Sequence, residues 1–444
     1  MSRAWLVLGL GAGDEGKGSV VDYLVRETGA RLVVRFNGGC QASHRVVLAD
    51  GRAHAFHQWG AGTFAGAQTY LGPEVVIDPV TMHEEAGELV ERGVARPWDL
   101  LTVDPDCPVT TPVHRAMNRL LEEERGAARH GSCGFGVGEV RRDMVEGRPV
   151  ITARDLLGQA VDVWDKLMAA KAHRHQELLA WTAYDRNRFE EFTSHYILRS
   201  WASVAAKAIR KAQTGGPFDA GDVVFEGAQG ALLDEWHGFY PHTSWGDCTF
   251  GGAERVLARW LPYDVTRLGV LRAYATRHGA GPLPTESREG WLKYVWPQAG
   301  HNGPNEWQGQ LRAGHFDAVL ARYALDVVGG VDGLALTCLD EVGLTWQACD
   351  RYLAHLAPPS PPLSVTRIKP SDPPSLDRME RLGRTLMDRA VTRPDITVTP
   401  GSVSRLVVQA LGVPVVLESR GPTHEGKTLA PGWSMRPSPA ETKP

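Results

Sequence analysis

The chain has few cysteines and no long apolar run, and both absences limit what it can be. Its six cysteines include no Cys-x-x-Cys pair, so neither a disulfide framework nor a zinc site is indicated. No apolar stretch approaches the roughly 20 residues that cross a membrane, and the start carries no basic-then-apolar signal. We therefore expect a soluble, cytoplasmic protein without a membrane partner.

An excess of charge of one sign is also missing. The 48 lysines and arginines against 52 acidic residues give a formal net charge of −4, without a long basic block. This balance argues against nucleic acid as a partner and favours small-molecule substrates. With 444 residues, 43% of them hydrophobic, the chain can bury a large core. We expect a single domain over residues 1–430 and a flexible tail at 431–444.

Glycines are concentrated in residues 9–18, directly after an apolar run. Gly11 and Lys17 have the spacing of a Walker A loop, in which backbone amides approach an oxyanion and the lysine neutralises it. Gly18 stands where such loops have the Ser or Thr that holds magnesium, and Asp14 lies inside the loop. The segment predicts a P-loop-like nucleotide-phosphate site. Taken alone, it could also be a glycine-rich turn with a solvated acidic tip.

Six short apolar runs each end in a cluster of glycine and polar residues. The runs are residues 4–8, 32–36, 223–225, 268–271, 334–336 and 413–417. Ligands bind outside the carboxyl ends of an open parallel sheet, so clusters far apart in sequence can meet at one edge. The pattern predicts an α/β fold with a large, mostly parallel central sheet. Residues 153–213, with few helix breakers, predict an inserted helical subdomain.

The clusters that follow these runs resemble, in chain order, the motifs of the adenylosuccinate synthetase family. Residues 12–19 are similar to its first loop, WGDEGKGK, and residues 38–44 to its GGHNAGH segment. The later matches are residues 225–234 to FEGAQGTLLD, 275–286 to STRVGAGPFPTE, 337–340 to TKLD and 419–422 to STGP. The resemblance covers nearly the whole chain.

This resemblance implies a C–N bond-forming ligase that uses GTP and Mg²⁺ to couple IMP to L-aspartate, giving adenylosuccinate. The 6-oxo oxygen is a poor leaving group, so the family phosphorylates it before an amine displaces phosphate. Asp14 would take the N1 proton and bind the metal, helped by the backbone carbonyl of Ser43. His44 would be the general acid, and the Lys17 charge would act on phosphate.

Other family contacts carry over by position. Gln229, which matches a glutamine beside the nucleotide, joins the catalytic set. The expected nucleotide contacts are Gly13, Glu15, Gly16, Gly18, Gln41, Ser132, Cys133, Ser244, Arg277, Arg312, Asp340, Ser419 and Gly421. Asp340 would read the N1 and N2 donors of guanine, which favours GTP because adenine has no such pair.

The departures from the family lie where substrate identity is decided. Its aspartate loop reads TTGRPRRxGW(F/L)D, but residues 305–317 keep a single arginine, Arg312. Gly309 and Leu311 stand at two family arginine positions, and each lost charge-assisted hydrogen bond would cost about 1.5–3 kcal/mol of binding. Cys338 also replaces a lysine that packs on the guanine base.

Three interpretations remain open from the sequence. The chain is an adenylosuccinate synthetase, a paralogue that applies the same chemistry to GMP, dGMP or another amine, or a non-catalytic nucleotide-binding protein. The retained Asp14 and His44 argue against the third. The resemblance also implies a homodimer whose partner lends an arginine to the nucleotide site, and Arg141, Arg142 and Arg148 are equal candidates for it.

Overall fold

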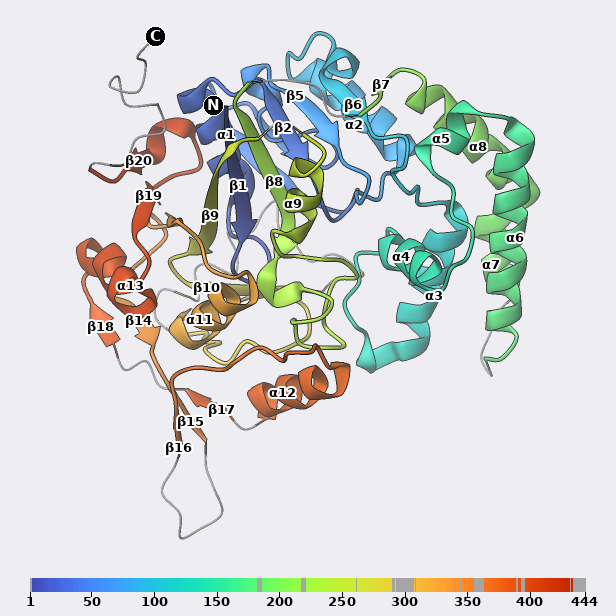
Figure 1. Cartoon of the computed structure of the whole chain (residues 1–444). Coiled ribbons are helices and arrows are strands. Elements are labelled where there is room, and N and C mark those ends of the chain that lie inside the picture. Colours follow the sequence, from blue (N-terminus) through green and yellow to red (C-terminus); the bar gives the residue numbers. More distant parts are fainter. Residues whose placement is uncertain are drawn as a thin grey trace.

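A ten-stranded sheet forms the centre of the molecule in the computed structural model (Figure 1). The structure describes residues 2–181, 186–216, 221–260, 262–289, 292, 307, 309–343, 345–354, 363–388, 390–392, 396–431 and 433. In spatial order the strands are β20 (Lys427–Leu429), β19 (Val415–Ser419), β13 (Gly333–Thr337), β9 (Asp264–Arg272), β1 (Arg3–Gly9), β8 (Val223–Gly230), β2 (Leu32–Arg35), β5 (Gln68–Leu71), β6 (Leu101–Val103) and β7 (Gln213–Thr214). Every neighbouring pair is parallel except β19 and β20. The predicted α/β fold is confirmed.

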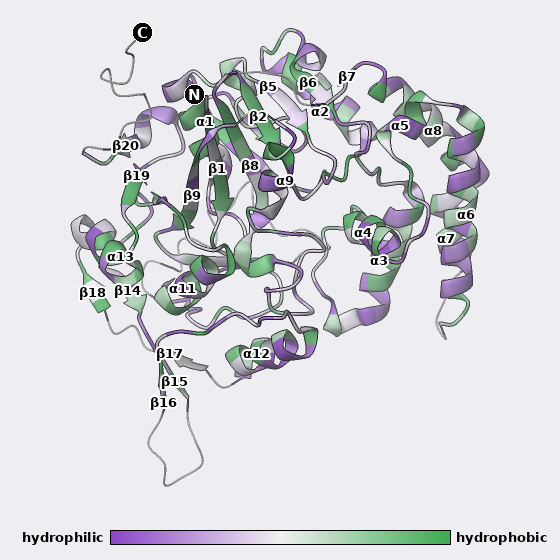
Figure 2. Cartoon of the chain, in the orientation of Figure 1, coloured by the Kyte–Doolittle hydropathy of each residue, from purple (hydrophilic) through white to green (hydrophobic). Residues whose placement is uncertain are grey.

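Side chains of β1 alternate between two hydrophobic cores, one on each face of the sheet. Trp5 and Val7 belong to the first core, whereas Leu6 and Leu8 belong to the second. All four are almost completely buried. A parallel strand covered on both faces needs apolar residues at every position, which explains the continuous apolar run in the sequence. Figure 2 shows the same contrast between the hydrophobic central strands and the more hydrophilic outer helices.

Residues of the surrounding helices complete both hydrophobic cores. The first core includes residues of α1 (Lys17–Thr28), α2 (Pro79–Glu91), α3 (Pro112–Arg125), α5 (Ala153–Leu157), α6 (Ala160–Leu178), α7 (Arg186–Thr193) and α8 (His195–Ile209). The second includes residues of α9 (Gly251–Leu257), α11 (Ala318–Val327), α12 (Leu376–Asp388) and α13 (Val403–Leu411). No helix in these described ranges is both long and apolar enough to cross a lipid bilayer.

Smaller sheets are built around the carboxyl ends of the main strands. They comprise β3 (His44–Val47) with β4 (Ala53–Phe56), β10 (Ala275–His278) with β11 (Leu311–Gly314), β12 (Phe316–Asp317) with β14 (Trp346–Cys349) and β18 (Ile396–Val398), and β15 (Tyr352–Ala354) with β16 (Leu363–Val365) and β17 (Ala390–Thr392). The β3–β4 pair begins at His44, and the β10–β11 pair contains residues 275–278. Both pairs therefore fix the backbone direction of these motif residues.

Helices α5 to α8 occupy the segment that the sequence predicts to be a helical subdomain, apart from residues 182–185, which lie outside the described part. They lie on one flank of the molecule together with α3 and α4 (Val137–Val145) (Figure 1). Arg174 of α6 is completely buried and donates a hydrogen bond to Asp143 of α4 over 2.6 Å. Whether this flank is a separate subdomain, and whether residues 431–444 form a tail, remain predictions.

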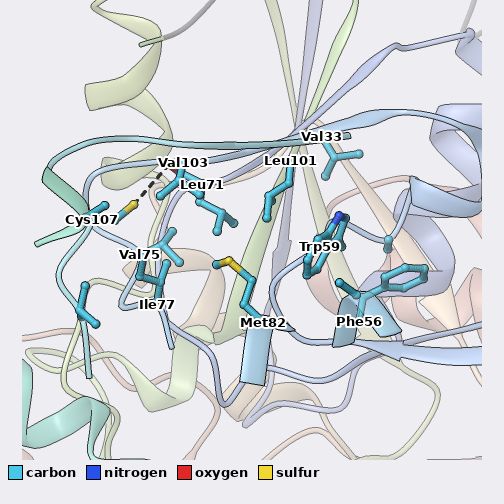
Figure 3. Packing of buried hydrophobic residues seen from close by; sticks show 14 of the residues in the cluster. Val33, Phe56, Trp59, Leu71, Val75, Ile77, Met82, Leu101, Val103 and Cys107 are labelled. Carbon is cyan, nitrogen blue, oxygen red and sulfur yellow. Dashed lines mark hydrogen bonds between the residues drawn. The ribbon is translucent and has the colours of Figure 1, made fainter. Parts of the chain in front are cut away.

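Packing in the first core is dense around Trp59 (Figure 3). Its indole Nε1 donates to the Pro97 carbonyl over 2.9 Å, so this large buried ring leaves no polar atom unpaired. The Cys107 thiol lies 3.4 Å from the Leu71 carbonyl oxygen, and burial raises its pKa well above the ordinary value. All six cysteines are free, and four of them are buried.

Truncating Leu6 tests how much the packing of the central strand contributes to the free energy of unfolding. Leu6→Ala removes a fully buried side chain from the central strand, so we expect the free energy of unfolding to fall by about 2–5 kcal/mol. Urea denaturation followed by tryptophan fluorescence measures the change. Val161→Ala, at a position that is 58% exposed on α6, is the matched control and should change stability by less than about 0.5 kcal/mol. Equal losses in the two variants would contradict the described packing.

Candidate active site

The glycine-rich loop after β1 is folded around the carboxylate of Glu15. Glu15 Oε1 accepts hydrogen bonds from the backbone amides of Gly11 at 3.0 Å and Gly13 at 2.9 Å. A Cβ atom at Gly9 or Gly230 would come within 2.3 Å of a Glu15 carboxylate oxygen. These glycines therefore leave the space that the buried carboxylate fills, and Glu15 points into the protein instead of towards solvent.

Lys17 begins α1, where the helix dipole also favours an anion. Its Nζ lies 2.5 Å from Glu15 Oε2, and both side chains are almost completely buried. Gly16 precedes it with a φ of 86°, a left-handed conformation that suits glycine. The ion pair with Glu15, within the same loop, therefore holds the Lys17 side chain at the start of α1.

Gly18 has a steric reason to be glycine. A Cβ atom there would lie 2.8 Å from the His44 Cβ and 2.9 Å from the His44 backbone carbon. A Ser or Thr, as in an ordinary Walker A loop, would not fit at this distance. The glycine thus brings the first turn of α1 directly against the start of β3.

Asp14 lies at the tip of the loop with a φ of 62°, which non-glycine residues seldom adopt. Its Oδ2 is 3.1 Å from Nε2 of His278, and the Asp14 side chain is 26% exposed. Burial alone would raise the pKa of Asp14. The hydrogen bond from His278 and the charges of His278 and Arg272 outweigh burial, so the pKa of Asp14 is lowered and the group is a carboxylate.

His44 is held by a second buried carboxylate. Its Nδ1 lies 2.5 Å from Glu226 Oε1, and Glu226 Oε2 accepts a hydrogen bond from the Ala61 amide at 3.0 Å. Burial raises the pKa of Glu226, but His44 and Arg35 outweigh it and hold that pKa below its usual range. Glu226 therefore accepts from Nδ1–H, and Nε2 is the ring nitrogen of His44 that this contact leaves available.

The Gly38–Gly39 turn lies against the end of β8, where Gln229 has a φ of 54°. A Cβ atom at Gly38 would be 2.9 Å from Gln229 Oε1, and one at Gly39 would be 2.8 Å from Gln41 Oε1. The two predicted nucleotide contacts, Gln229 and Gln41, thus lie on either side of one turn. Gln41 Oε1 is buried without a hydrogen-bond partner among the described residues.

Three expected guanine contacts meet at the ends of β13 and β19. The Leu339 amide, beside Asp340, donates to the Ser419 carbonyl over 3.1 Å. Ser419 Oγ in turn donates to the Gly421 carbonyl over 3.2 Å. Burial is the main cause that raises the pKa of Asp340, with the neighbouring Glu341 adding to it.

Lys427 is a cation of this region that sequence reasoning missed. It pairs with Ser419 in the β19–β20 register, and its Nζ donates to the Thr423 carbonyl over 2.8 Å. Burial lowers its pKa to about 8, against the raising effect of Asp340 and other acids nearby. Cys338, where the family has lysine, also interacts with it electrostatically. Lys427, from the edge strand β20, therefore lies near Cys338, the position at which the family has lysine.

Arg277 and Arg312 face each other across the β10–β11 pair. Arg277 donates to the carbonyls of Ala280 at 2.8 Å and His242 at 2.7 Å, and burial lowers its pKa to about 10. Arg312 forms an ion pair with Glu286 at 2.5 Å and also donates to two backbone carbonyls. Both guanidinium groups thus hold the strand ends together.

The remaining expected phosphate contacts are spread over two loops. Ser132 Oγ accepts a hydrogen bond from Asn118 over 2.8 Å, and burial raises the pKa of Cys133. The Ser244 amide donates to the Leu233 carbonyl, over 2.8 Å, close to the first loop. A ring contact between His130 and His242, with centroids 6.4 Å apart, connects the two loops.

Trp307 carries part of the predicted amino-acid loop onto the Ser132 loop. A Cβ atom at Gly134 would come within 2.9 Å of the Trp307 ring. The guanidinium carbons of Arg119 and Arg129 lie 5.6 and 6.0 Å from the ring centroid. Within the loop over residues 305–317, residues 305, 306 and 308 lie outside the described part of the chain.

The donor set at the loop tip suits Mg²⁺. Asp14 offers a hard carboxylate oxygen, and Ser43, the other predicted ligand, is exposed beside His44. The described residues contain no group of three His, Cys, Asp or Glu that could hold a metal by themselves. Mg²⁺ is commonly bound by one or two carboxylates together with substrate phosphates, so this sparse set fits it.

The three candidate arginines for a partner's site are all bound within their own chain. Arg142 pairs with Glu177 at 2.5 Å and Arg148 with Asp143 at 2.9 Å. Arg141 donates to the backbone carbonyl of residue 74.

The structure brings the predicted segments together through direct contacts. Gly18 touches His44, and the Thr337 hydroxyl, beside the Asp340 loop, donates to the Glu15 carbonyl over 2.7 Å. A backbone bridge links Ala12 to Arg277. Sequence reasoning missed Glu226, although a lone carboxylate in an apolar strand signals a buried partner.

Comparisons with known proteins show which family the chain belongs to. The family model described as adenylosuccinate synthetase matches residues 6–354. The adenylosuccinate synthetase of Alkalilimnicola ehrlichii is 32% identical over 450 residues, which cover 95% of this chain and 96% of that protein.

Two solved structures share the fold. One is a fully ligated adenylosuccinate synthetase from Plasmodium falciparum, with a TM-score of 0.71, 20% identity and coverage of 96% of this chain and 99% of the other. The second is a cyanophage S-2L succinoaminodeoxyadenylate synthetase bound to dGMP and dATP, with a TM-score of 0.53, 19% identity and coverage of 97% and 96%. Sequence, site and fold lead to one conclusion: the chain belongs to the adenylosuccinate synthetase family.

Proposed function

We propose that this chain couples IMP to L-aspartate with GTP and Mg²⁺, giving adenylosuccinate, GDP and phosphate. One observation carries the assignment: within this family's fold, the ionised Asp14 stands at the tip of a phosphate loop. A solvated turn would not bury Lys17 and Glu15 behind that carboxylate. The family is typically homodimeric, and its substrates are small molecules. We place the reaction in the cytoplasm.

Asp14 starts the reaction as a general base. It accepts the N1 proton of hypoxanthine, and the electron pair released from the N1–H bond makes O6 nucleophilic. O6 then forms a bond to the γ-phosphorus of GTP while the bond to the oxygen between the β- and γ-phosphates breaks. Bound Mg²⁺ would neutralise phosphate charge, held by Asp14 and the Ser43 carbonyl. Lys17 adds a positive charge at the start of α1.

His44 supports the same step from the other side of Gly18. Glu226 holds the Nδ1–H, so Nε2 is directed to the ligand side and can hold a proton at the oxygens where charge develops. In the second half of the reaction the amine attacks C6, and the O6-phosphate group leaves as inorganic phosphate. The roles of Gln229, Gln41, Ser132, Cys133 and Ser244 are to position the acceptor nucleotide. Asp340, Ser419 and Gly421 hold guanine.

A second candidate retains the phosphorylation step but uses a different amine. The observation in its favour is that Arg312, the only arginine left in the amino-acid loop, already pairs with Glu286 and two carbonyls. A dicarboxylate would have to displace these bonds or be gripped by fewer groups. The same chemistry on GMP or dGMP belongs to this candidate as well.

The deciding experiment is a GTP-dependent phosphate-release assay with mass detection of the product. With IMP, aspartate and magnesium we expect adenylosuccinate and one phosphate for each GDP. Parallel reactions replace IMP by GMP or dGMP, and aspartate by other amines. Turnover only with one of these replacements would establish the second candidate, and binding without any turnover would overturn the catalytic assignment.

Asp14→Asn should abolish phosphate release with IMP, by at least three orders of magnitude in kcat, because the amide cannot accept the N1 proton. Asp14→Ala should have the same effect. Circular dichroism serves as the control for folding, since it does not depend on proton abstraction. Substantial residual turnover in either variant would remove Asp14 from the role of base.

Glu226→Gln tests the support of His44 separately from His44 itself. The glutamine keeps the shape but replaces the carboxylate that accepts from Nδ1–H, so we expect kcat to fall about 10²–10⁴-fold with little change in KM for GTP. His44→Ala should lose at least as much activity. Near wild-type kcat for Glu226→Gln would show that the carboxylate only fills space.

A further inference from the structure

Trp307 places a large aromatic ring in the amino-acid loop, residues 305–317, where the family motif has threonine. Aligned on Gly314 and Asp317, the second threonine of TTGRPRRxGW(F/L)D falls on position 307. We propose that Trp307 is a positioning residue that docks the amino-acid loop on the acceptor-phosphate loop, residues 131–134, and so strengthens binding of the amine. This inference rests on the proposed function, which assigns the two loops to the amine and to the acceptor nucleotide.

The half-buried indole ring of Trp307 lies directly against Gly134, the last residue of the acceptor-phosphate loop. A Cβ atom at Gly134 would come within 2.9 Å of the ring. Gly134 also has a φ of 78°, a left-handed conformation that favours glycine. A larger residue at position 134 would therefore strain the backbone and displace the indole.

Two arginines contact the same ring. The guanidinium carbon of Arg119 lies 5.6 Å from the ring centroid of Trp307, and that of Arg129 lies 6.0 Å from it. Arg119 Nε donates to the Gly134 carbonyl over 3.3 Å, and Arg129 Nε donates to the Glu122 carbonyl over 3.1 Å. These backbone contacts fix both guanidinium groups, which attract the face of an aromatic ring. Only an aromatic side chain gains this attraction, and threonine would not.

The acceptor-phosphate loop is itself held by α3. Asn118 Nδ2 donates to Ser132 Oγ over 2.8 Å, and the Gly131 amide donates to Glu122 Oε2 over 2.9 Å. Both Asn118 and Glu122 are buried. Trp307 therefore docks on a surface whose position is set by a helix of the first core.

The start of β11 gives the amino-acid loop a second anchor. The Gly279 amide donates to the Gln310 carbonyl over 2.9 Å. Arg312 Nη1 donates to the carbonyls of Gly279 and Gly281, each over 2.8 Å. In the described part of the loop, Trp307 is thus a separate point of attachment that leads to the other substrate's loop.

The loss of arginines from the amino-acid loop makes this docking consequential. Arg312 is the single arginine left in residues 305–317, so an amine that carries carboxylates forms fewer charge-assisted hydrogen bonds with the loop. Ordering a loop costs conformational entropy, which reduces the affinity for the ligand that must order it. A loop that Trp307 already holds loses less entropy when the amine binds.

The test is a double-mutant cycle across the contact, made in the full-length enzyme. Trp307→Ala should raise KM for aspartate about ten- to a hundredfold, because amine binding must then order the loop. KM for GTP, and kcat at saturating aspartate, should stay close to the wild-type values. Gly134→Ala, although it lies in the other loop, should also raise KM for aspartate. The double variant should be no worse than the worse single variant, because both changes break one contact.

Two controls accompany the cycle. Trp307→Phe keeps an aromatic face for Arg119 and Arg129 and should recover most of the affinity for aspartate. Trp236→Ala removes an indole that is 49% exposed and lies outside this contact, so KM for aspartate should not change. Hydrogen exchange at the amides of residues 131–134 provides a readout without turnover, and we expect it to be faster in Trp307→Ala than in the wild type.

A wild-type KM for aspartate in Trp307→Ala would overturn the proposal, and so would additive effects of the two substitutions. Losses that phenylalanine does not restore, with kcat and GTP affinity reduced as well, would make Trp307 a merely structural residue. If the wild type does not turn over IMP and aspartate, the proposed function fails. The exchange rates would then still decide the docking, because unchanged exchange at residues 131–134 in Trp307→Ala would overturn it.

Discussion

The site depends on one buried interaction, the placement of the Glu15 carboxylate in a socket of glycines. Two loop amides and Lys17 Nζ surround that carboxylate, and no side chain larger than hydrogen fits at Gly9 or Gly230. A buried carboxylate is tolerated only when it is fully hydrogen-bonded and paired. Satisfying Glu15 therefore determines the path of the loop, and with it the outward position of Asp14.

The same contacts connect the loop to the rest of the sheet. Gly230 comes from β8 and Thr337 from β13, and the latter donates to the Glu15 backbone carbonyl. Gly18 brings α1 against His44, which is backed by Glu226 on β8. The proposed base, the proposed acid and the phosphate loop are thus fixed relative to one another by these contacts, which is what transition-state stabilisation by preorganised groups requires.

The sequence predicted the sheet and the sites at its strand ends because both leave local signals. Continuous apolar runs indicate strands buried on both faces, and the clusters after them mark one edge. Glu226 and Glu15 left weaker signals, because a carboxylate's partner is chosen by tertiary packing and not by its neighbours in sequence. The contact between His278 and Asp14 could not be predicted for the same reason. It joins positions 14 and 278 through the pairing of separate strands.

Cationic groups have been redistributed in this chain relative to the family pattern. Cys338 and Leu311 stand at family positions for lysine and arginine, whereas Lys427 and His278 bring donors from adjacent strands into the same regions. Arg277 donates its hydrogen bonds to backbone carbonyls, and Arg312 pairs with Glu286. A motif comparison alone would therefore not locate the donors that lie in these regions of the chain.

The order of strands across the sheet also bears on how the enzyme is made. Asp14 lies in the loop after the first strand of the chain, whereas Ser419 and Lys427 belong to its last two strands, which form one edge of the sheet. During synthesis, the guanine pocket cannot close until nearly the entire polypeptide has left the ribosome. A truncated or nascent chain that contains the phosphate loop but not β19 and β20 therefore lacks the residues proposed to hold guanine.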